Sequence, residues 1–180
     1  SLIDGGRAYW LANGLPLTTD VPSYASTGIQ LPEPDFSTRA FQRDLADELG
    51  APDLALVDVR SPAEYAGEVV APPGMSETAQ RAGHIPGAAS APWAQTVNED
   101  GTFKSADALR AHYESKGVTA DRDVVAYCRI GERSSHTWFV LHELLGYERV
   151  RNYDGSWTEW GSIIGAPIEN PAKEGVAVPA

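Results

Sequence analysis

Short apolar runs alternate along this chain with segments in which apolar residues recur every three or four positions. The runs at 54–57 and 124–127 are aliphatic and partly β-branched, and they predict buried strands of a parallel sheet. Residues 150–153 predict another strand, and residues 89–92 a short one. Strands that alternate with helical segments are typical of an α/β fold, so we expect a mainly parallel central sheet flanked by helices.

Capping signals mark where the helices begin and end. Thr38 predicts the start of a helix that carries Leu45 and ends at Gly50. Ser61-Pro62-Ala63-Glu64 has the form of a capping box with proline at the first helical position, which gives Glu64 a structural explanation. Ser105 predicts the cap of a further helix.

One short segment occurs twice, about a domain length apart. Residues 4–10 (Asp-Gly-Gly-Arg-Ala-Tyr-Trp) resemble residues 154–160 (Asp-Gly-Ser-Trp-Thr-Glu-Trp), and a Gly-x-Pro-apolar element follows each. We therefore expect residues 1–17 to be the tail of a preceding copy of the same domain. Chance similarity is the alternative.

The remaining boundaries follow from composition. Residues 18–37 are rich in Pro, Ser and Thr and predict an extended linker. The domain itself is expected at 38–169, and residues 170–180 are expected to form a loose C-terminal tail. Because the chain starts at Ser1 rather than Met, we expect a processed form or a fragment.

Charge and cysteine content narrow the function classes. Fourteen Lys and Arg against 25 Asp and Glu give a net charge of −11, which disfavours nucleic acid and anionic membranes as partners. A single cysteine excludes an internal disulfide and a cysteine-rich metal site. Without a long apolar run or signal peptide, a soluble cytoplasmic protein is expected, and a reducing compartment suits a required thiol.

The only cysteine, Cys128, lies between the predicted strand 123–127 and a predicted helix that ends near Gly146. Gly131 permits a tight turn, and the N–H groups at the start of the helix point into the same loop. Arg129 and Arg133 flank the thiol. Helix N-termini and guanidinium groups favour the thiolate, so we expect a nucleophile in a cradle that accepts anions. A buried, inert cysteine is the alternative.

Three further residues are candidates for the site. Asp58 and Arg60 follow the strand at 54–57, and ligands bind at this edge of open α/β sheets. His84 precedes a tight turn at residues 85–88, and we expect it to fix that turn by hydrogen bonds rather than to act in catalysis.

Four motifs in this order resemble the rhodanese (thiosulfate sulfurtransferase) family over roughly residues 38–169. The chain is most similar to the second, catalytic copy of the actinobacterial two-domain thiosulfate sulfurtransferases, together with the end of the first copy. The four motifs are Leu56-Val57-Asp58-Val59-Arg60, Gly83-His84-Ile85-Pro86-Gly87-Ala88, Tyr127-Cys128-Arg129-Ile130-Gly131-Glu132-Arg133-Ser134, and residues 152–160.

The resemblance implies a two-step sulfur transfer without a cofactor or metal. The Cys128 thiolate takes the sulfane sulfur of thiosulfate and releases sulfite, and cyanide or a thiol then removes that sulfur. The loop implied to hold substrate and persulfide consists of Arg129, Ile130, Gly131, Glu132, Arg133 and Ser134, with Arg60 as a further substrate-binding residue. Asp58 is implied to orient one of the arginines, and Glu64 and His84 to support the site.

Two positions depart from the mammalian pattern. Ile130 stands where that loop carries a lysine, and Glu64 where a second substrate-binding arginine falls. Arg129, Arg133 and Arg60 must then meet the substrate charge. The alternatives are a mercaptopyruvate sulfurtransferase, whose loop resembles Cys-Gly-Ser-Gly, and a persulfide carrier or sensor. A Cys-dependent phosphatase is disfavoured, because Tyr127 precedes the cysteine and Arg133 follows it by five positions instead of six.

Overall fold

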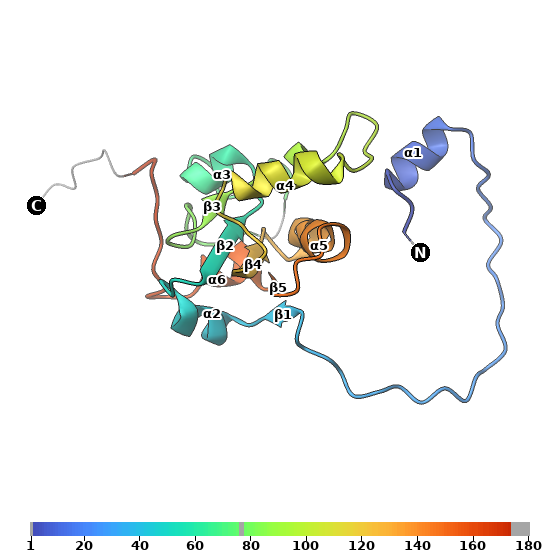
Figure 1. The fold of residues 1–180 in the computed structure, drawn as a ribbon, viewed down its shortest axis with the longest axis horizontal. Coiled ribbons are helices and arrows are strands. Elements are labelled where there is room, and N and C mark those ends of the chain that lie inside the picture. Colours follow the sequence, from blue (N-terminus) through green and yellow to red (C-terminus); the bar gives the residue numbers. More distant parts are fainter. Residues whose placement is uncertain (1, 76–77, 174–180) are drawn as a thin grey trace, which may run out of the picture.

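The computed structural model describes residues 2–75 and 78–173. Within them, five parallel strands form one sheet in the order β1-β5-β4-β2-β3 (Figure 1). The strands are β1 (Arg39–Ala40), β2 (Leu54–Asp58), β3 (Ala89–Ser90), β4 (Asp123–Tyr127) and β5 (Val150–Tyr153). The expected α/β fold with a parallel central sheet is therefore confirmed.

Helical segments cover both faces of the sheet. They are α2 (Gln42–Glu48), α3 (Pro62–Ala66), the 3₁₀ turn η1 (Trp93–Thr96), α4 (Ala106–Glu114), α5 (Glu132–Phe139), its π-helical continuation η2 (Val140–Leu144) and α6 (Ser156–Trp160). A further helix, α1 (Gly6–Ala12), lies apart from the sheet (Figure 1). Leu109 of α4 and Leu141 of η2 pack with the side chains of one face. Leu45 of α2 and Trp157 of α6 pack with those of the other.

The two central strands set the register of the site. Val57 of β2 lies beside Ala126 of β4, and Asp58 beside Tyr127, so both strands end together at one edge of the sheet. Side chains alternate between the two cores, because successive residues of a strand point to opposite faces. At this edge Tyr127 belongs to the α2/α6 side and Cys128 to the α4/α5 side.

Most of the expected helix signals are confirmed. The Ser61 side chain accepts from the Glu64 amide while the Glu64 carboxylate accepts from the Ser61 amide, which completes the capping box. Ser105 caps α4 as expected. Thr38 does not cap α2, because residues 39–40 first pair with β5 as an edge strand and the helix begins after Phe41. Two residues are too few to show a strand pattern in the sequence.

The N-terminal segment repeats details of α6. Gly6, the first residue of α1, has φ +59°, and Ser156, the first residue of α6, has φ +50°. The indole of Trp10 donates to the Pro16 carbonyl at 3.0 Å, as the indole of Trp160 donates to the Pro167 carbonyl at 2.9 Å. The similarity noted in the sequence therefore extends to backbone conformation and hydrogen bonding.

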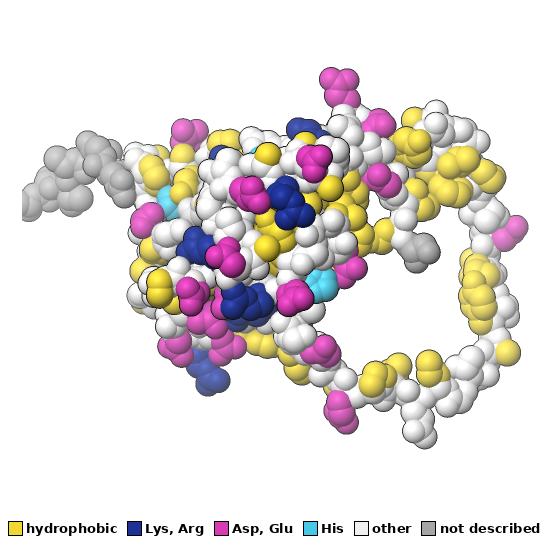
Figure 2. All heavy atoms as spheres, in the orientation of Figure 1, with side chains coloured by type: hydrophobic (Ala, Val, Ile, Leu, Met, Phe, Trp, Pro, Cys, Tyr) yellow, Lys and Arg dark blue, Asp and Glu magenta, His cyan; other side chains and the backbone are white. Residues whose placement is uncertain are grey.

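The surroundings of the two segments differ. Trp160 is fully buried, whereas α1 contains no buried residue and lies at the end of the long extended segment 18–37 (Figure 1). Hydrophobic side chains remain visible along α1 and this segment (Figure 2). One hydrogen bond, from the Phe103 amide to the Asp4 carboxylate at 2.9 Å, joins α1's leading turn to the domain. The described helices include none with the length and apolar character needed to span a bilayer.

Candidate active site

Cys128 lies directly after β4, where the chain leaves the sheet and enters the loop before α5. Its side chain is fully buried and packs on one side against aliphatic residues of the α4/α5 core. On another side the Cys128 side chain lies close enough to the Arg133 guanidinium to help raise the pKa of that group. Burial alone would suit an inert cysteine, but a guanidinium beside the sulfur is a polar environment that stabilises a thiolate.

The start of α6 holds the loop through backbone hydrogen bonds. The amides of Trp157 and Thr158 donate to the carbonyls of Cys128 and Arg129, each at 3.0 Å. A trans peptide directs its N–H opposite its C=O, so the amides of Arg129 and Ile130 point away from α6. The free amides at the start of α6 thus fix the direction of two N–H groups in the loop, which point to the side opposite α6.

Ser156 completes this support. Its hydroxyl accepts from the Cys128 amide at 3.1 Å and donates to the Tyr153 carbonyl at 2.6 Å. The side chain is fully buried, and the residue has φ +50°, a strained backbone for a residue other than glycine. Ser156 fixes the cysteine backbone, and the sequence analysis did not single it out.

Gly131 makes the tight turn that the sequence predicts. Its φ is +85°, and a Cβ at this position would come within 2.9 Å of the Asp154 Cα. The carbonyl of Gly131 accepts from the Asn152 amide side chain at 3.2 Å and from the Ser135 backbone at 3.0 Å. A side chain at position 131 would therefore push the loop away from the turn after β5.

Glu64 and Arg133 are joined across the site by two hydrogen bonds, each 3.0 Å long. The Glu64 carboxylate is fully buried, whereas the Arg133 side chain is 18% exposed. Burial opposes the charge of both groups, but their ion pair outweighs it. With the hydrogen bonds of the Ser61 cap, the pair lowers the pKa of Glu64; with the Cys128 sulfur, it raises the pKa of Arg133.

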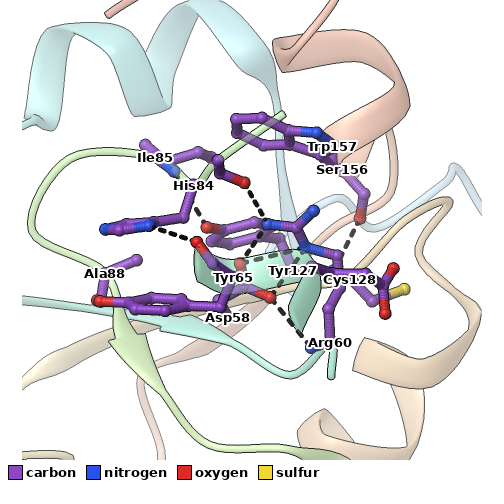
Figure 3. Close-up of polar contacts among 12 residues, drawn as sticks. Asp58, Arg60, Tyr65, His84, Ile85, Ala88, Tyr127, Cys128, Ser156 and Trp157 are labelled. Carbon is purple, nitrogen blue, oxygen red and sulfur yellow. Dashed lines mark hydrogen bonds and ion pairs between the residues drawn. The ribbon is translucent and has the colours of Figure 1, made fainter. Parts of the chain in front are cut away.

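Asp58 and Arg60 form a second, fully buried ion pair under the loop. The Asp58 carboxylate accepts from Nε of Arg60 at 3.0 and 3.1 Å and from its Nη2 at 2.6 Å, and Nη2 also donates to the Gly83 carbonyl at 2.7 Å. The guanidinium lies against the Trp157 ring, 4.6 Å from its centroid (Figure 3). The structure thus places Arg60 in a fully buried ion pair with Asp58, and the expected contact of Arg60 with substrate stays a prediction.

Tyr127 and His84 lie at the neighbouring turn. The Tyr127 hydroxyl accepts from the Ile85 amide at 3.1 Å, and burial together with Asp58 raises the pKa of this tyrosine well above its usual value. His84 stacks on Tyr65 with 3.7 Å between ring centroids, and its ring nitrogens bond to the Tyr65 carbonyl and the Glu169 carboxylate. These bonds tie His84 to α3 and to Glu169, and its expected function in fixing the turn at residues 85–88 stays a prediction.

The remaining loop residues differ in exposure. Arg129 is 5% exposed, and its Nη2 lies 3.9 Å from the carboxylate of Glu132, whose side chain is 61% exposed. Ser134 is buried, and its hydroxyl has no hydrogen-bond partner among the described residues. Ile130 is 39% exposed, so the loop presents an apolar side chain to solvent.

A pocket of about 210 Å³ opens beside this loop, lined by Trp93, Glu132, Arg133 and His136. Arg133 thus contacts both the pocket and the Cys128 sulfur. Within the part of the chain that the structure describes, no three His, Cys, Asp or Glu side chains cluster as potential metal ligands.

A family model for the rhodanese-like domain matches residues 41–163. The chain belongs to the rhodanese-like family. Curated relatives include a Haloferax volcanii protein named "Putative thiosulfate sulfurtransferase", 56% identical over 93% of this chain and 58% of its own length. A Saccharopolyspora erythraea protein of the same name is 55% identical over 97% of this chain and 62% of its own.

A third relative, the sulfur carrier protein TtuD of Thermus thermophilus, is 56% identical over 93% of this chain and 60% of its own length. The chain thus spans only about three fifths of these relatives. Among solved structures, the anaerobic ergothioneine biosynthesis enzyme of Chlorobium limicola superposes with a TM-score of 0.82 at 29% identity, covering 93% of this chain and 40% of that one.

Proposed function

We propose that this chain is a sulfurtransferase in which Cys128 carries a sulfane sulfur as a persulfide. The donor is thiosulfate and the acceptor is cyanide or a thiol. The observation that carries the proposal is the loop itself: α6 holds the carbonyls of Cys128 and Arg129, which turns the following amides toward the side where a second sulfur would lie.

In the first step the Cys128 thiolate attacks the outer sulfur of thiosulfate. A new S–S bond forms to the cysteine, the S–S bond of thiosulfate breaks, and its electron pair leaves with sulfite. In the second step the acceptor attacks the outer sulfur of the persulfide, and the electron pair of the breaking bond returns to Cys128. No net oxidation of the protein occurs, so no cofactor is required.

The charged residues have separate tasks in this scheme. Arg133 lies at the sulfur and stabilises the thiolate and the anionic persulfide, with Glu64 holding its guanidinium in place. Arg129 meets the charge of the donor from the loop. The buried pair of Asp58 and Arg60 positions the end of β2 next to the loop.

The relatives support sulfur chemistry at such a cysteine. Two are named "Putative thiosulfate sulfurtransferase", and a solved structure of the protein EanB, described as a cysteine persulfide, is 29% identical with a TM-score of 0.81. A mercaptopyruvate donor is disfavoured, because two arginines in the loop suit a doubly charged inorganic anion better than a keto acid.

A second candidate function is a persulfide carrier that delivers sulfur to a protein partner. Two observations favour it: one relative is named a sulfur carrier protein, and Ile130 places an exposed apolar side chain on the loop. Turnover separates the two functions, because an enzyme converts thiosulfate and cyanide to thiocyanate many times, whereas a carrier loads once and waits for its partner.

We further propose that residues 1–17 are the tail of a preceding rhodanese-like domain and that the protein acts in the cytoplasm. The matching φ values of Gly6 and Ser156 and the matching indole hydrogen bonds support the first proposal. The need for a free thiol supports the second.

Mass spectrometry tests the central proposal. After incubation with thiosulfate, the intact chain should gain the mass of one sulfur at Cys128, and Cys128→Ser should gain none while keeping its fold. An unmodified Cys128 in folded protein would contradict the thiosulfate step.

A further inference from the structure

The pocket beside the Cys128 loop contains a histidine that the scheme above does not use. His136 lies one helical turn after Glu132 on α5, and residues four apart share a face of a helix. Its ring packs at 5.5 Å from that of Trp93 and at 4.9 Å from that of Phe103. The lining of the pocket therefore includes two aromatic rings, those of Trp93 and His136.

His136 retains hydrogen-bonding capacity that the chain itself does not employ. Its Nδ1 is buried and has no partner among the residues that the structure describes. This nitrogen is enclosed by protein atoms, so a molecule in the pocket meets the ring at Nε2. Burial also lowers the pKa of His136, which keeps the ring neutral and able to accept a proton.

The other histidines do not line this pocket. Both ring nitrogens of His84 are bonded, and His142 stacks on Trp138 and pairs with Glu143. His112 lies on α4 against Tyr113. Of the four histidines in the chain, His136 is the one that lines the pocket next to Arg133.

We propose that this pocket is the acceptor subsite, that it takes a small organic thiol, and that His136 is the base that removes the proton from that thiol. The inference rests on the proposed persulfide at Cys128 and names the acceptor side of the same site. Arg133 connects the two places, because it lines the pocket and interacts with the Cys128 side chain.

The transfer step balances with these groups alone. The acceptor S–H proton passes to the neutral imidazole of His136, and the electron pair left on that sulfur forms a bond to the outer sulfur of the persulfide. The S–S bond to Cys128 breaks, and its pair remains on Cys128 as the thiolate. The imidazolium then returns its proton to water or to the departing persulfide.

The size and lining of the pocket define the class of acceptor. The pocket has a volume of about 210 Å³ and is open to solvent, so it accommodates a small molecule without enclosing it. Trp93 and the His136 ring offer apolar contact to its carbon atoms. A compact uncharged thiol such as 2-mercaptoethanol therefore serves as the probe.

The test compares two acceptors on the preloaded chain. Cys128 is loaded with sulfur, excess donor is removed, and loss of the persulfide is followed in a single turnover with 2-mercaptoethanol or with sulfite. Sulfite carries no S–H, so it needs no base. We expect His136→Gln to slow discharge to the thiol by roughly a hundredfold, the scale of general base catalysis, and to leave discharge to sulfite within about twofold.

His142→Gln is the matched control, since it changes a histidine outside the pocket, and both reactions should remain unchanged. Discharge to sulfite also reports whether His136→Gln is folded, and His136→Ala with added imidazole gives a second measurement in which thiol discharge should recover. The assignment of His136 would be overturned if His136→Gln discharged to each acceptor as fast as wild type does. It would also be overturned if the variant lost the same factor in rate with 2-mercaptoethanol and with sulfite.

Failure of this proposal is distinguishable from failure of the proposed function. If thiosulfate does not load Cys128, the donor assignment fails at the loading step. The chain can then be loaded with inorganic polysulfide, and the comparison of the two acceptors is carried out as before.

Discussion

Arg133 and Glu64 meet through Nη1 and Nη2 of the guanidinium and both carboxylate oxygens, although 69 residues separate them in the chain. Glu64 also completes the capping box of α3 with Ser61, so one carboxylate both caps a helix and holds the arginine beside Cys128. The Cys128 loop is thereby attached to α3, the helix that follows β2, as well as to β4. The predictions below test this attachment and the loop that it supports.

Arg133→Ala should make Cys128 a weaker nucleophile near neutral pH. Without the guanidinium at the sulfur, the rate of alkylation should reach its half-maximal value at higher pH. Sulfur transfer from thiosulfate should lose roughly ten- to hundredfold in kcat/KM, the scale of one hydrogen bond to a charged group. Arg149→Ala is the control, because Arg149 lies outside the site and pairs with Asp123. An alkylation profile equal to that of wild type would remove Arg133 from the proposal.

Glu64→Gln should reduce stability in a manner that depends on pH. Glutamine keeps the capping box but loses the charge, so the variant should unfold with about 1.5–3 kcal/mol less free energy at neutral pH. The folded-state pKa of Glu64 is lowered, so its contribution is full above the ordinary range of a glutamate and is lost as the pH falls through the folded value.

Urea unfolding of wild type and Glu64→Gln at neutral and acidic pH measures this difference. The two proteins should converge in stability as the pH falls through that range. A difference that stays constant with pH would show that the charge of Glu64 does not contribute.

Gly131→Ala should damage both the fold and the loop. The left-handed backbone costs an alanine about 1–2 kcal/mol, and its Cβ would also meet the Asp154 backbone. Gly146→Ala is a matched control, because Gly146 has φ +73° and nothing within 4 Å of an added Cβ. Thermal unfolding should show a larger loss of stability for Gly131→Ala than for Gly146→Ala. Sulfur loading should be lost only in Gly131→Ala. Equal effects at both positions would mean that backbone strain is the only cost.

Residues 2–37 should be cleaved by protease well before the domain. The segment 18–37 is extended and exposed, and α1 has no buried residue, so little packing protects them. Limited proteolysis followed by mass spectrometry should first release fragments ending in this region. Strong protection there would contradict the proposal that the segment belongs with a preceding domain.

The sequence predicts those parts of the site that depend on neighbouring residues. The apolar run before Cys128, the glycine turn and the following helix are local, as is the capping box at Ser61 and Glu64, and the structure confirms them. The function of His84 in fixing a turn is likewise predicted from neighbouring residues, because a Gly-Pro-Gly environment surrounds it.

Other features depend on contacts between distant segments. No local pattern shows that Glu64 pairs with Arg133, or that Arg60 lies buried under Trp157. Ser156 could be found only through the motif at residues 152–160, since its function is to bind the backbone of Cys128. The edge strand at 39–40 was missed because two residues show no alternation.

The hydrogen bonds between α6 and the Cys128 loop determine where a minimal version of this domain can end. A chain cut after β5 would keep the sheet and the nucleophile, yet it would lose Ser156 and the amides that orient the peptide groups around the sulfur. The working unit therefore extends past its last strand, and anyone dividing the protein into pieces should place the cut beyond residue 160.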